Sequence, residues 1–252
     1  MTLTLFFAAL SGMAMTLLFA FNPMLSFWWR IPVWLGLYVG IGVVHLIVII
    51  TCVLIMPRSA SLRSWVRLTL DWVLTLIGYR IRLTDTEKLP CVPFLLVCNH
   101  RSAFDPLCTI AVMTQSPIFV AKPSVFRIPL IGTIMRRLGF MPIDRENARN
   151  AVATIKQAAA LIREEGLCVG IYPEGTRSKT GELLPFHAGS FKIAAMADCP
   201  VAVAAIRYEK RGLWGKRVHL QIVDVMDADF VSANTTAAMA DRAKSAITAI
   251  LF

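Results

Sequence analysis

The stretch that decides the fold is FLLVCNHRSAFDP, residues 94–106. Its first five residues are apolar, which is typical of a strand buried on both faces of a parallel sheet. The apolar run ends at Asn99-His100, and Pro106 suits the first turn of a following helix. The residue before a proline avoids the α region, so we expect Asp105 to lie outside that helix, at its N-cap. A turn between strand and helix would then bring the Asp105 carboxylate onto His100.

Similar apolar runs alternate with helical patterns from residue 80 onward. This alternation predicts an α/β fold with a largely parallel central sheet flanked by helices. Five runs are predicted as buried strands, and a sixth alternates apolar and polar residues, which we interpret as an edge strand. The predicted strands are 94–98, 118–121, 140–143, 168–172, 201–206 and, at the edge, 217–225. The predicted helices are 106–114, 146–165 and 235–250.

Polar clusters follow three of these strands at the point where each strand ends. His100 follows the first, Asp144-Arg145 follows 140–143, and PEGTRS (173–178) follows 168–172. Ligand sites of open α/β sheets gather outside the carboxyl ends of the strands. The sequence therefore predicts one composite site at this edge of the sheet.

A histidine beside a carboxylate is a paired base, because the carboxylate fixes the tautomer and stabilises the imidazolium. The chain has no Ser or Cys elbow of the GxSxG type, which disfavours a hydrolase with a covalent intermediate. The proton would then come from a substrate hydroxyl. On spacing alone, the alternative stays open that Asp105 only caps a helix and that His100 is an ordinary surface residue.

Three sequence blocks, in this order, resemble those of the glycerolipid acyltransferases: NHRSAFD (99–105), GFMPIDR (139–145) and YPEGTRS (172–178). CPVAV (199–203) is similar to the apolar fourth block of the family. The resemblance covers roughly residues 80–225, and the 1-acylglycerol-3-phosphate (lysophosphatidate) acyltransferases are the most similar members.

This resemblance implies transfer of a fatty acyl group from acyl-CoA or acyl-carrier protein to lysophosphatidate, giving phosphatidate. It implies that His100 is the general base and that Asp105 orients it. A carboxylate repels phosphate, so Glu174 is expected to bond the glycerol hydroxyl or to position an arginine, whereas guanidinium groups bind phosphate bidentately. No cofactor and no metal are expected. The implied glycerol phosphate site is Arg145, Glu174, Gly175, Thr176 and Arg177, with Lys122 and Asn99 as further candidates.

Two alternatives remain. In the first, the acceptor is another lysolipid, such as a lyso-ornithine lipid or a lysophospholipid. In the second, the protein is a membrane-anchored module that binds lipid without catalysis. Nucleic acid is not an expected partner, because no recognition helix, zinc finger or RNA-binding signature accompanies the basic charge.

The chain of 252 residues has a formal net charge of +10, but residues 1–57 contain a single charged side chain, Arg30. Within them, the apolar runs 3–22 and 32–56 are long enough to span a bilayer. Basic residues dominate after the second run, so the positive-inside rule places the rest of the chain in the cytoplasm. We therefore expect a protein of the cytoplasmic membrane, whose N-terminal hairpin either crosses the bilayer or enters one leaflet.

The segment 61–77 has an amphipathic pattern with a basic stripe. It fits both a helix lying in the membrane interface and a core helix of the following domain. We thus expect a membrane-embedded hairpin at 1–57, an interfacial helix or linker at 58–79 and a catalytic domain at 80–252.

Overall fold

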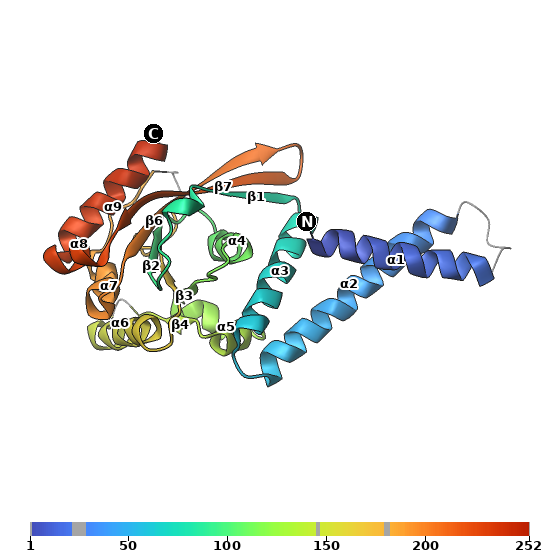
Figure 1. The fold of residues 1–252 in the computed structure, drawn as a ribbon, viewed down its shortest axis with the longest axis horizontal. Coiled ribbons are helices and arrows are strands. Elements are labelled where there is room, and N and C mark those ends of the chain that lie inside the picture. Colours follow the sequence, from blue (N-terminus) through green and yellow to red (C-terminus); the bar gives the residue numbers. More distant parts are fainter. Residues whose placement is uncertain (1, 22–28, 145–146, 179–181, 252) are drawn as a thin grey trace.

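The computed structural model describes residues 2–21, 29–144, 147–178 and 182–251. Within them, one sheet has the strand order β1-β7-β6-β2-β5-β3-β4 (Figure 1). Neighbouring strands are parallel except β6 and β7, which are antiparallel. The predicted fold class, a largely parallel sheet flanked by helices, is confirmed. The strands are β1 (Tyr79–Thr84), β2 (Leu95–Cys98), β3 (Ile118–Ala121), β4 (Met141–Pro142), β5 (Val169–Ile171), β6 (Val201–Arg211) and β7 (Gly215–Met226).

The prediction of an edge strand at 217–225 is wrong, because β7 lies between β1 and β6. Its apolar residues Val218, Leu220 and Ile222 are completely buried. The alternation of apolar and polar residues reports that only one face of a strand is covered, and it says nothing of a neighbour in the plane of the sheet. That neighbour is β1, which the sequence reading did not identify.

Helices cover both faces of the sheet. The predicted helices at 106–114, 146–165 and 235–250 correspond to α4, α6 and α9, whereas the short α5, α7 and α8 were not predicted. Within the described ranges, 3₁₀ turns lie at Thr86–Lys88, Pro123–Arg127 and Ala188–Phe191. The α-helices are α1 (Thr2–Phe21), α2 (Arg30–Ile55), α3 (Ala60–Leu76), α4 (Asp105–Val112), α5 (Ile131–Leu138), α6 (Ala148–Arg163), α7 (Lys192–Ala197), α8 (Ala228–Ala233) and α9 (Thr236–Leu251).

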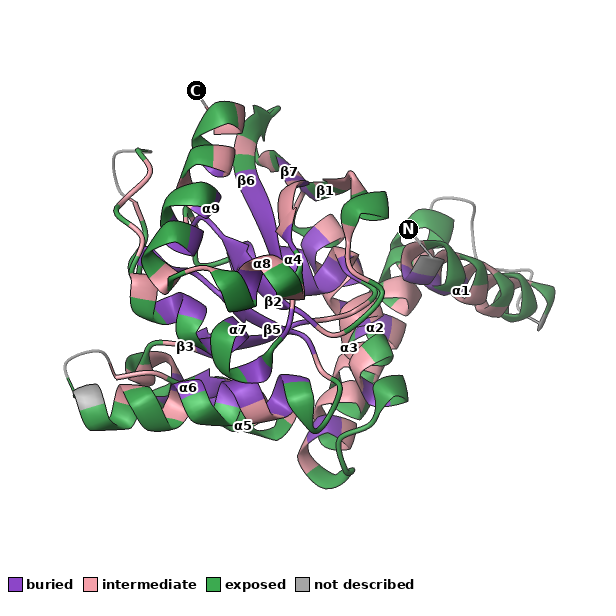
Figure 2. Ribbon diagram, turned by 60° about the vertical axis from the view of Figure 1, so that its left-hand side comes forward, coloured by how far each residue is buried: buried purple, intermediate pink, exposed green. Residues whose placement is uncertain are grey.

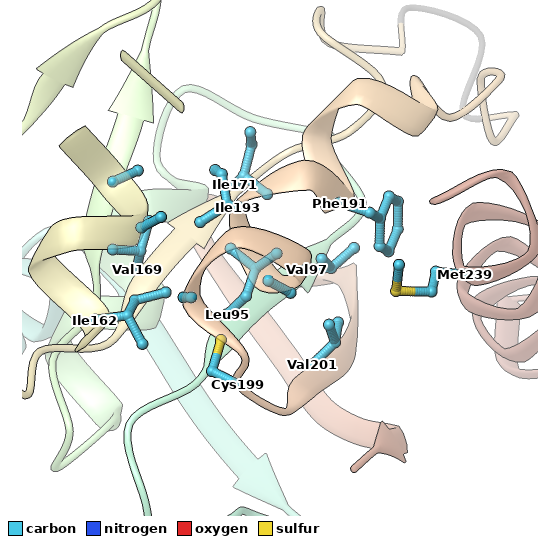
Figure 3. Close-up of a cluster of buried hydrophobic side chains, with 14 of the residues drawn as sticks. Leu95, Val97, Ile162, Val169, Ile171, Phe191, Ile193, Cys199, Val201 and Met239 are labelled. Carbon is cyan, nitrogen blue, oxygen red and sulfur yellow. The ribbon is translucent and has the colours of Figure 1, made fainter. Parts of the chain in front are cut away.

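The buried core has two halves because successive side chains of a strand point to opposite faces. On β2, Leu95 and Val97 pack with residues of α6, α7 and α9 (Figure 3). Leu96 and Cys98 pack with residues of α3 and α4 on the other face. Figure 2 shows the strands buried at the centre of the molecule. The short apolar strand β2 is thus held from both sides, which fixes the position of the residues that follow it.

Helices α1 and α2 form a hairpin that extends away from the sheet (Figure 1). Both are long and apolar enough to cross a membrane, and only 17% and 11% of the residues in the two apolar spans are buried within the protein. These properties fit membrane association.

Helix α3 connects this hairpin to the sheet. The Trp72 indole N–H donates to the Tyr38 hydroxyl of α2 at 3.0 Å, and its ring meets Phe7 of α1 edge-on, with 5.0 Å between centroids. Two residues further along the helix, Leu74 is buried in the core half that contains α4. Helix α3 therefore contacts the apolar helices and the sheet at once, which combines features of both predicted placements.

Candidate active site

His100 and Asp105 meet directly beyond the end of β2. The Asp105 Oδ2 atom lies 2.8 Å from the His100 Nδ1 atom and also accepts the backbone N–H groups of Arg101 and Ser102 at 2.7 and 2.8 Å. Asp105 is completely buried, while the His100 side chain is about one-fifth exposed. Among the described residues, none forms a hydrogen bond with His100 Nε2. The turn between strand and helix therefore leaves one ring nitrogen bonded and the other available.

The prediction that Asp105 is the N-cap of the helix is wrong. The N-cap is Phe104, and Asp105 is the first residue of α4. Its carboxylate does not accept from the first helical turn but points back along the chain. Pro106 fits within that first turn because its missing N–H has no intrahelical partner. The backward hydrogen bonds to the Asp105 carboxylate stabilise the turn and offset the usual aversion of a residue before proline to helical geometry.

A third residue, Tyr208 of β6, completes the surroundings of the carboxylate. Its hydroxyl donates to the second oxygen, Oδ1, of Asp105. Burial raises the pKa of Tyr208, and the negative charge of Asp105 raises it further, so the phenol stays protonated and acts as a donor. Sequence reasoning missed this residue, since Tyr208 is 103 positions from Asp105 and only the pairing of β6 beside β2 brings them together.

The PEGTRS turn (173–178), which follows β5, is hydrogen-bonded to the backbone of His100. The His100 N–H donates to Glu174 Oε1 at 2.6 Å, and the Ser178 N–H donates to the His100 carbonyl at 3.1 Å. The other Glu174 oxygen accepts the Leu184 N–H at 3.1 Å. Glu174 is only 4% exposed, and this burial raises the pKa of its carboxyl. Both Glu174 oxygens thus bond backbone, and its contact with a glycerol hydroxyl or with an arginine stays a prediction.

The other residues of this turn lie open. Gly175, Thr176 and Arg177 are exposed, and Gly175 has a φ of 77°, which favours glycine. Lys122 is exposed just beyond β3, which is parallel to β5 and ends at the same edge of the sheet. Arg145 lies outside the described residues. The structure thus brings His100 and the PEGTRS turn together, as the positions of the strand ends predict.

Asn99 points away from this open edge. Its amide bonds the backbone of Ile206 twice, donating to the carbonyl at 3.0 Å and accepting the N–H at 2.7 Å. The Asn99 side chain thereby joins the end of β2 to β6, in the way that one more pair of backbone hydrogen bonds between the strands would. The CPVAV block (199–203) lies at the opposite, amino-terminal end of β6, where Val201 pairs with Leu95.

Aromatic rings stack against one face of the His100 imidazole. Its imidazole stacks on the Tyr172 ring with 4.3 Å between centroids, and Tyr172 stacks on Phe119 at 5.2 Å. The Phe119 ring lies so close to Gly170 that a Cβ atom there would be 2.4 Å from the Phe119 Cε1 atom. This column fixes the plane of the imidazole.

A family profile and two curated relatives that are similar to this chain in sequence all carry the name acyltransferase. The sequence profile described as Acyltransferase matches residues 80–207. A chloroplastic 1-acyl-sn-glycerol-3-phosphate acyltransferase of Brassica napus is 38% identical over 49% of this chain and 36% of its own length. A 1-acyl-sn-glycerol-3-phosphate acyltransferase of Borreliella burgdorferi is 34% identical over 48% of each chain. The chain thus spans about a third to a half of the length of these relatives.

The fold is also similar to a solved structure. The crystal structure of the 1-acyl-sn-glycerophosphate acyltransferase PlsC from Thermotoga maritima matches 81% of this chain and 85% of its own chain. The TM-score is 0.64 at 21% sequence identity, which shows a shared fold.

Proposed function

This chain belongs to the acyltransferase family, and from that premise we propose that it acylates the free hydroxyl of 1-acylglycerol-3-phosphate to give phosphatidate. The donor is a fatty acyl thioester, acyl-CoA or acyl-carrier protein. The observation that carries the proposal is the 2.8 Å contact of His100 with Asp105 at the open edge of the sheet. The names of the relatives support the acceptor.

In this reaction His100 acts as the general base. Its Nε2 atom takes the proton of the acceptor hydroxyl while that oxygen attacks the thioester carbonyl. Collapse of the tetrahedral intermediate breaks the carbon–sulfur bond, and the thiolate receives the proton from the imidazolium. The products are an ester and a free thiol, so the reaction needs no covalent acyl-enzyme.

Asp105 holds His100 in one tautomer, because its carboxylate accepts from Nδ1 and thereby leaves Nε2 without a proton. Tyr208 holds the carboxylate in turn, through the bond to Oδ1. Glu174 is assigned a positioning role, since it holds the His100 backbone through a bond of 2.6 Å. These three residues act through His100 and do not contact the substrate.

The acceptor phosphate binds at the exposed part of the PEGTRS turn and at neighbouring cations. Arg177 offers a bidentate guanidinium, and Thr176 offers a backbone N–H. Gly175 supplies the positive φ of the turn and leaves its exposed side open, while its own N–H donates to the Tyr172 carbonyl at 3.1 Å. Lys122 and Arg145 are further cations for this site. Asn99 is excluded from the proposal because both polar atoms of its side chain bond Ile206.

The N-terminal segment 1–57 serves as the membrane anchor, 58–79 as the connecting helix, and 80–252 as the catalytic part. The basic residues that follow α2 support a cytoplasmic position for the catalytic part. A membrane-resident acceptor and a soluble thioester would then meet at the cytoplasmic membrane surface.

The mechanism is tested by the release of free thiol from acyl-CoA in the presence of lysophosphatidate, with the purified protein in detergent. We expect His100→Ala to abolish thiol release while the fold is retained, and the exposed His187→Gln to serve as a matched control with full turnover. Near-normal turnover of His100→Ala would contradict the mechanism.

The acceptor is tested with pairs of lysolipids that differ in a terminal phosphomonoester. Arg177→Ala should raise the KM for lysophosphatidate with little change in kcat. If a lyso-ornithine lipid or an uncharged lysolipid is turned over as fast as lysophosphatidate or faster, lysophosphatidate is not the preferred acceptor and the proposal is contradicted. Lysolipid binding without any thioester consumption by the native protein would refute catalysis as a whole.

A further inference from the structure

The turn between β6 and β7 presents two large apolar side chains to solvent. Leu213 is 94% exposed and Trp214 is 89% exposed, more than any other large hydrophobic residue that the structure describes. They lie side by side at the tip of a β-hairpin, and neither contributes to the core clusters. Burial in an apolar phase would remove most of this surface from water, which is the condition for a favourable contact.

Cations flank this pair on both strands. Lys210 and Arg211 precede it, Lys216 and Arg217 follow it, and all four are exposed. The one acid nearby, Glu209, lies 3.8 Å from Arg217. We call residues 210–217 the β6–β7 tip. A tryptophan with basic neighbours matches the surface of a bilayer that contains anionic lipid, where indole rings gather and cations are attracted to the headgroups.

The β6–β7 tip lies beside the part of the protein that suits a membrane. The Lys216 N–H donates to the Gly78 carbonyl at 3.2 Å, directly beyond the end of α3. Leu76 and Ile77, at that end of α3, are each about half exposed, and Trp72 one turn earlier contacts α1. Figure 1 shows this turn, α3 and the start of α1 on the same flank of the sheet. The exposed side chains of the tip therefore lie near the end of α3, the helix that also contacts the apolar hairpin.

The same strand leads from the tip to the site. β6 runs parallel to β2 and continues beyond it, past the level of His100. Tyr208, which bonds Asp105, precedes Leu213 by five residues, so at most about 17 Å of chain separates the two. The tip thus projects from the edge of the sheet at which His100 lies.

We propose that the β6–β7 tip is a second membrane contact, in which Leu213 and Trp214 enter the headgroup region of an anionic bilayer and the four cations bind its surface. This contact is separate from α1 and α2, and its effect is to hold the open edge of the sheet against the membrane. It does not rest on the proposed acyl transfer, because it follows from the exposed side chains and charges of the tip alone.

The test uses tryptophan fluorescence of the full chain, reconstituted in phosphatidylglycerol vesicles with or without lipid brominated near the headgroup. The chain has six tryptophans, so the emission of Trp214 is taken as the difference between the native protein and Trp214→Phe. We expect this difference emission to be blue-shifted and mostly quenched by the brominated lipid. Emission that stays unshifted and unquenched would overturn the proposal. A blue shift without quenching would also overturn it, because a protein surface, such as a second copy, would then cover the tip.

The role of the cations is tested by varying the share of phosphatidylglycerol in phosphatidylcholine vesicles. Lys210→Gln and Arg211→Gln should each weaken the anionic-lipid-dependent insertion of Trp214 by about five-fold. A matched control on α6, Lys156→Gln with Val152→Ser, replaces an exposed cation and an exposed apolar residue and should change nothing. Quenching that is equal in phosphatidylcholine and phosphatidylglycerol would overturn the assignment to anionic lipid.

Discussion

Replacement of Glu174 separates a positioning role from a substrate contact. Its two oxygens accept the N–H groups of His100 and Leu184 at 2.6 and 3.1 Å, in a position only 4% exposed. Glu174→Ala leaves both N–H groups without this acceptor. Each buried polar group left unsatisfied costs about 1–3 kcal/mol. Removal of a buried carboxylate also relieves its desolvation, which places the expected loss of stability at the lower end, about 2–4 kcal/mol.

This loss should appear in thermal unfolding in detergent as a decrease of roughly 4–16 °C in Tm. The control is Glu164→Gln, which changes an exposed carboxylate on the same protein and should leave Tm unchanged. Since the His100 backbone loses one of its two bonds to the PEGTRS turn, kcat should fall by up to about a hundredfold, as expected for misplacement of a base by about 1 Å. The KM for the acceptor should change little.

Two results would refute this reasoning. The first is an unchanged Tm together with an unchanged kcat, which would mean that the carboxylate does not hold the strand end. The second is a rise in the acceptor KM at constant kcat in Glu174→Gln, which would mean that Glu174 binds the acceptor directly.

The remaining predictions concern neighbouring groups. Tyr208→Phe removes a donor from the buried Asp105 carboxylate, so we expect a loss of about 1.5–3 kcal/mol in unfolding free energy and a lower kcat at unchanged acceptor KM. Gly170→Ala would place a methyl group against the Phe119 ring; overpacking should cost about 1–3 kcal/mol in unfolding free energy, and an unchanged Tm would contradict the close approach. Burial raises the pKa of Glu174 above its ordinary value of 4.5, so the folded protein binds more protons than the unfolded chain between the two pKa values. The stability margin of the native protein over Glu174→Gln should therefore be largest below pH 4.5 and shrink as pH rises through the raised pKa, in urea unfolding at a series of pH values.

Much of the fold was predictable because buried strands and long amphipathic helices leave strong local patterns. The runs at 118–121 and 168–172 coincide with β3 and β5 within a residue at each end. Strand β1 was missed, since its alternation of arginines with Ile81 and Leu83 spans only six residues and lacks the apolar run by which the other strands were identified. The edge position assigned to 217–225 failed for a related reason, because lateral order in a sheet is set by long-range pairing.

The site was predictable to the extent that one short segment encodes it. The proximity of His100 and Asp105 follows from a strand end, a turn and a helix start within seven residues of sequence. The Tyr208 hydroxyl, which donates to the other carboxylate oxygen, did not follow, because the pairing of β6 with β2 places it beside Asp105. The placement of Glu174 likewise did not follow. Its side-chain direction is set by the backbone N–H groups of His100 and Leu184, which need a hydrogen-bond acceptor once they are buried.

The stacked rings of Tyr172 and Phe119 make the two faces of the His100 imidazole unequal. With the Tyr172 ring stacked 4.3 Å below it, one face of the imidazole is closed to any substrate, so an acceptor can approach only from the opposite side or along the ring edge. The closed face is an electron-rich π surface, which attracts a cation above it. The ring that blocks approach from below therefore also stabilises the imidazolium at the moment when the proton rests on His100.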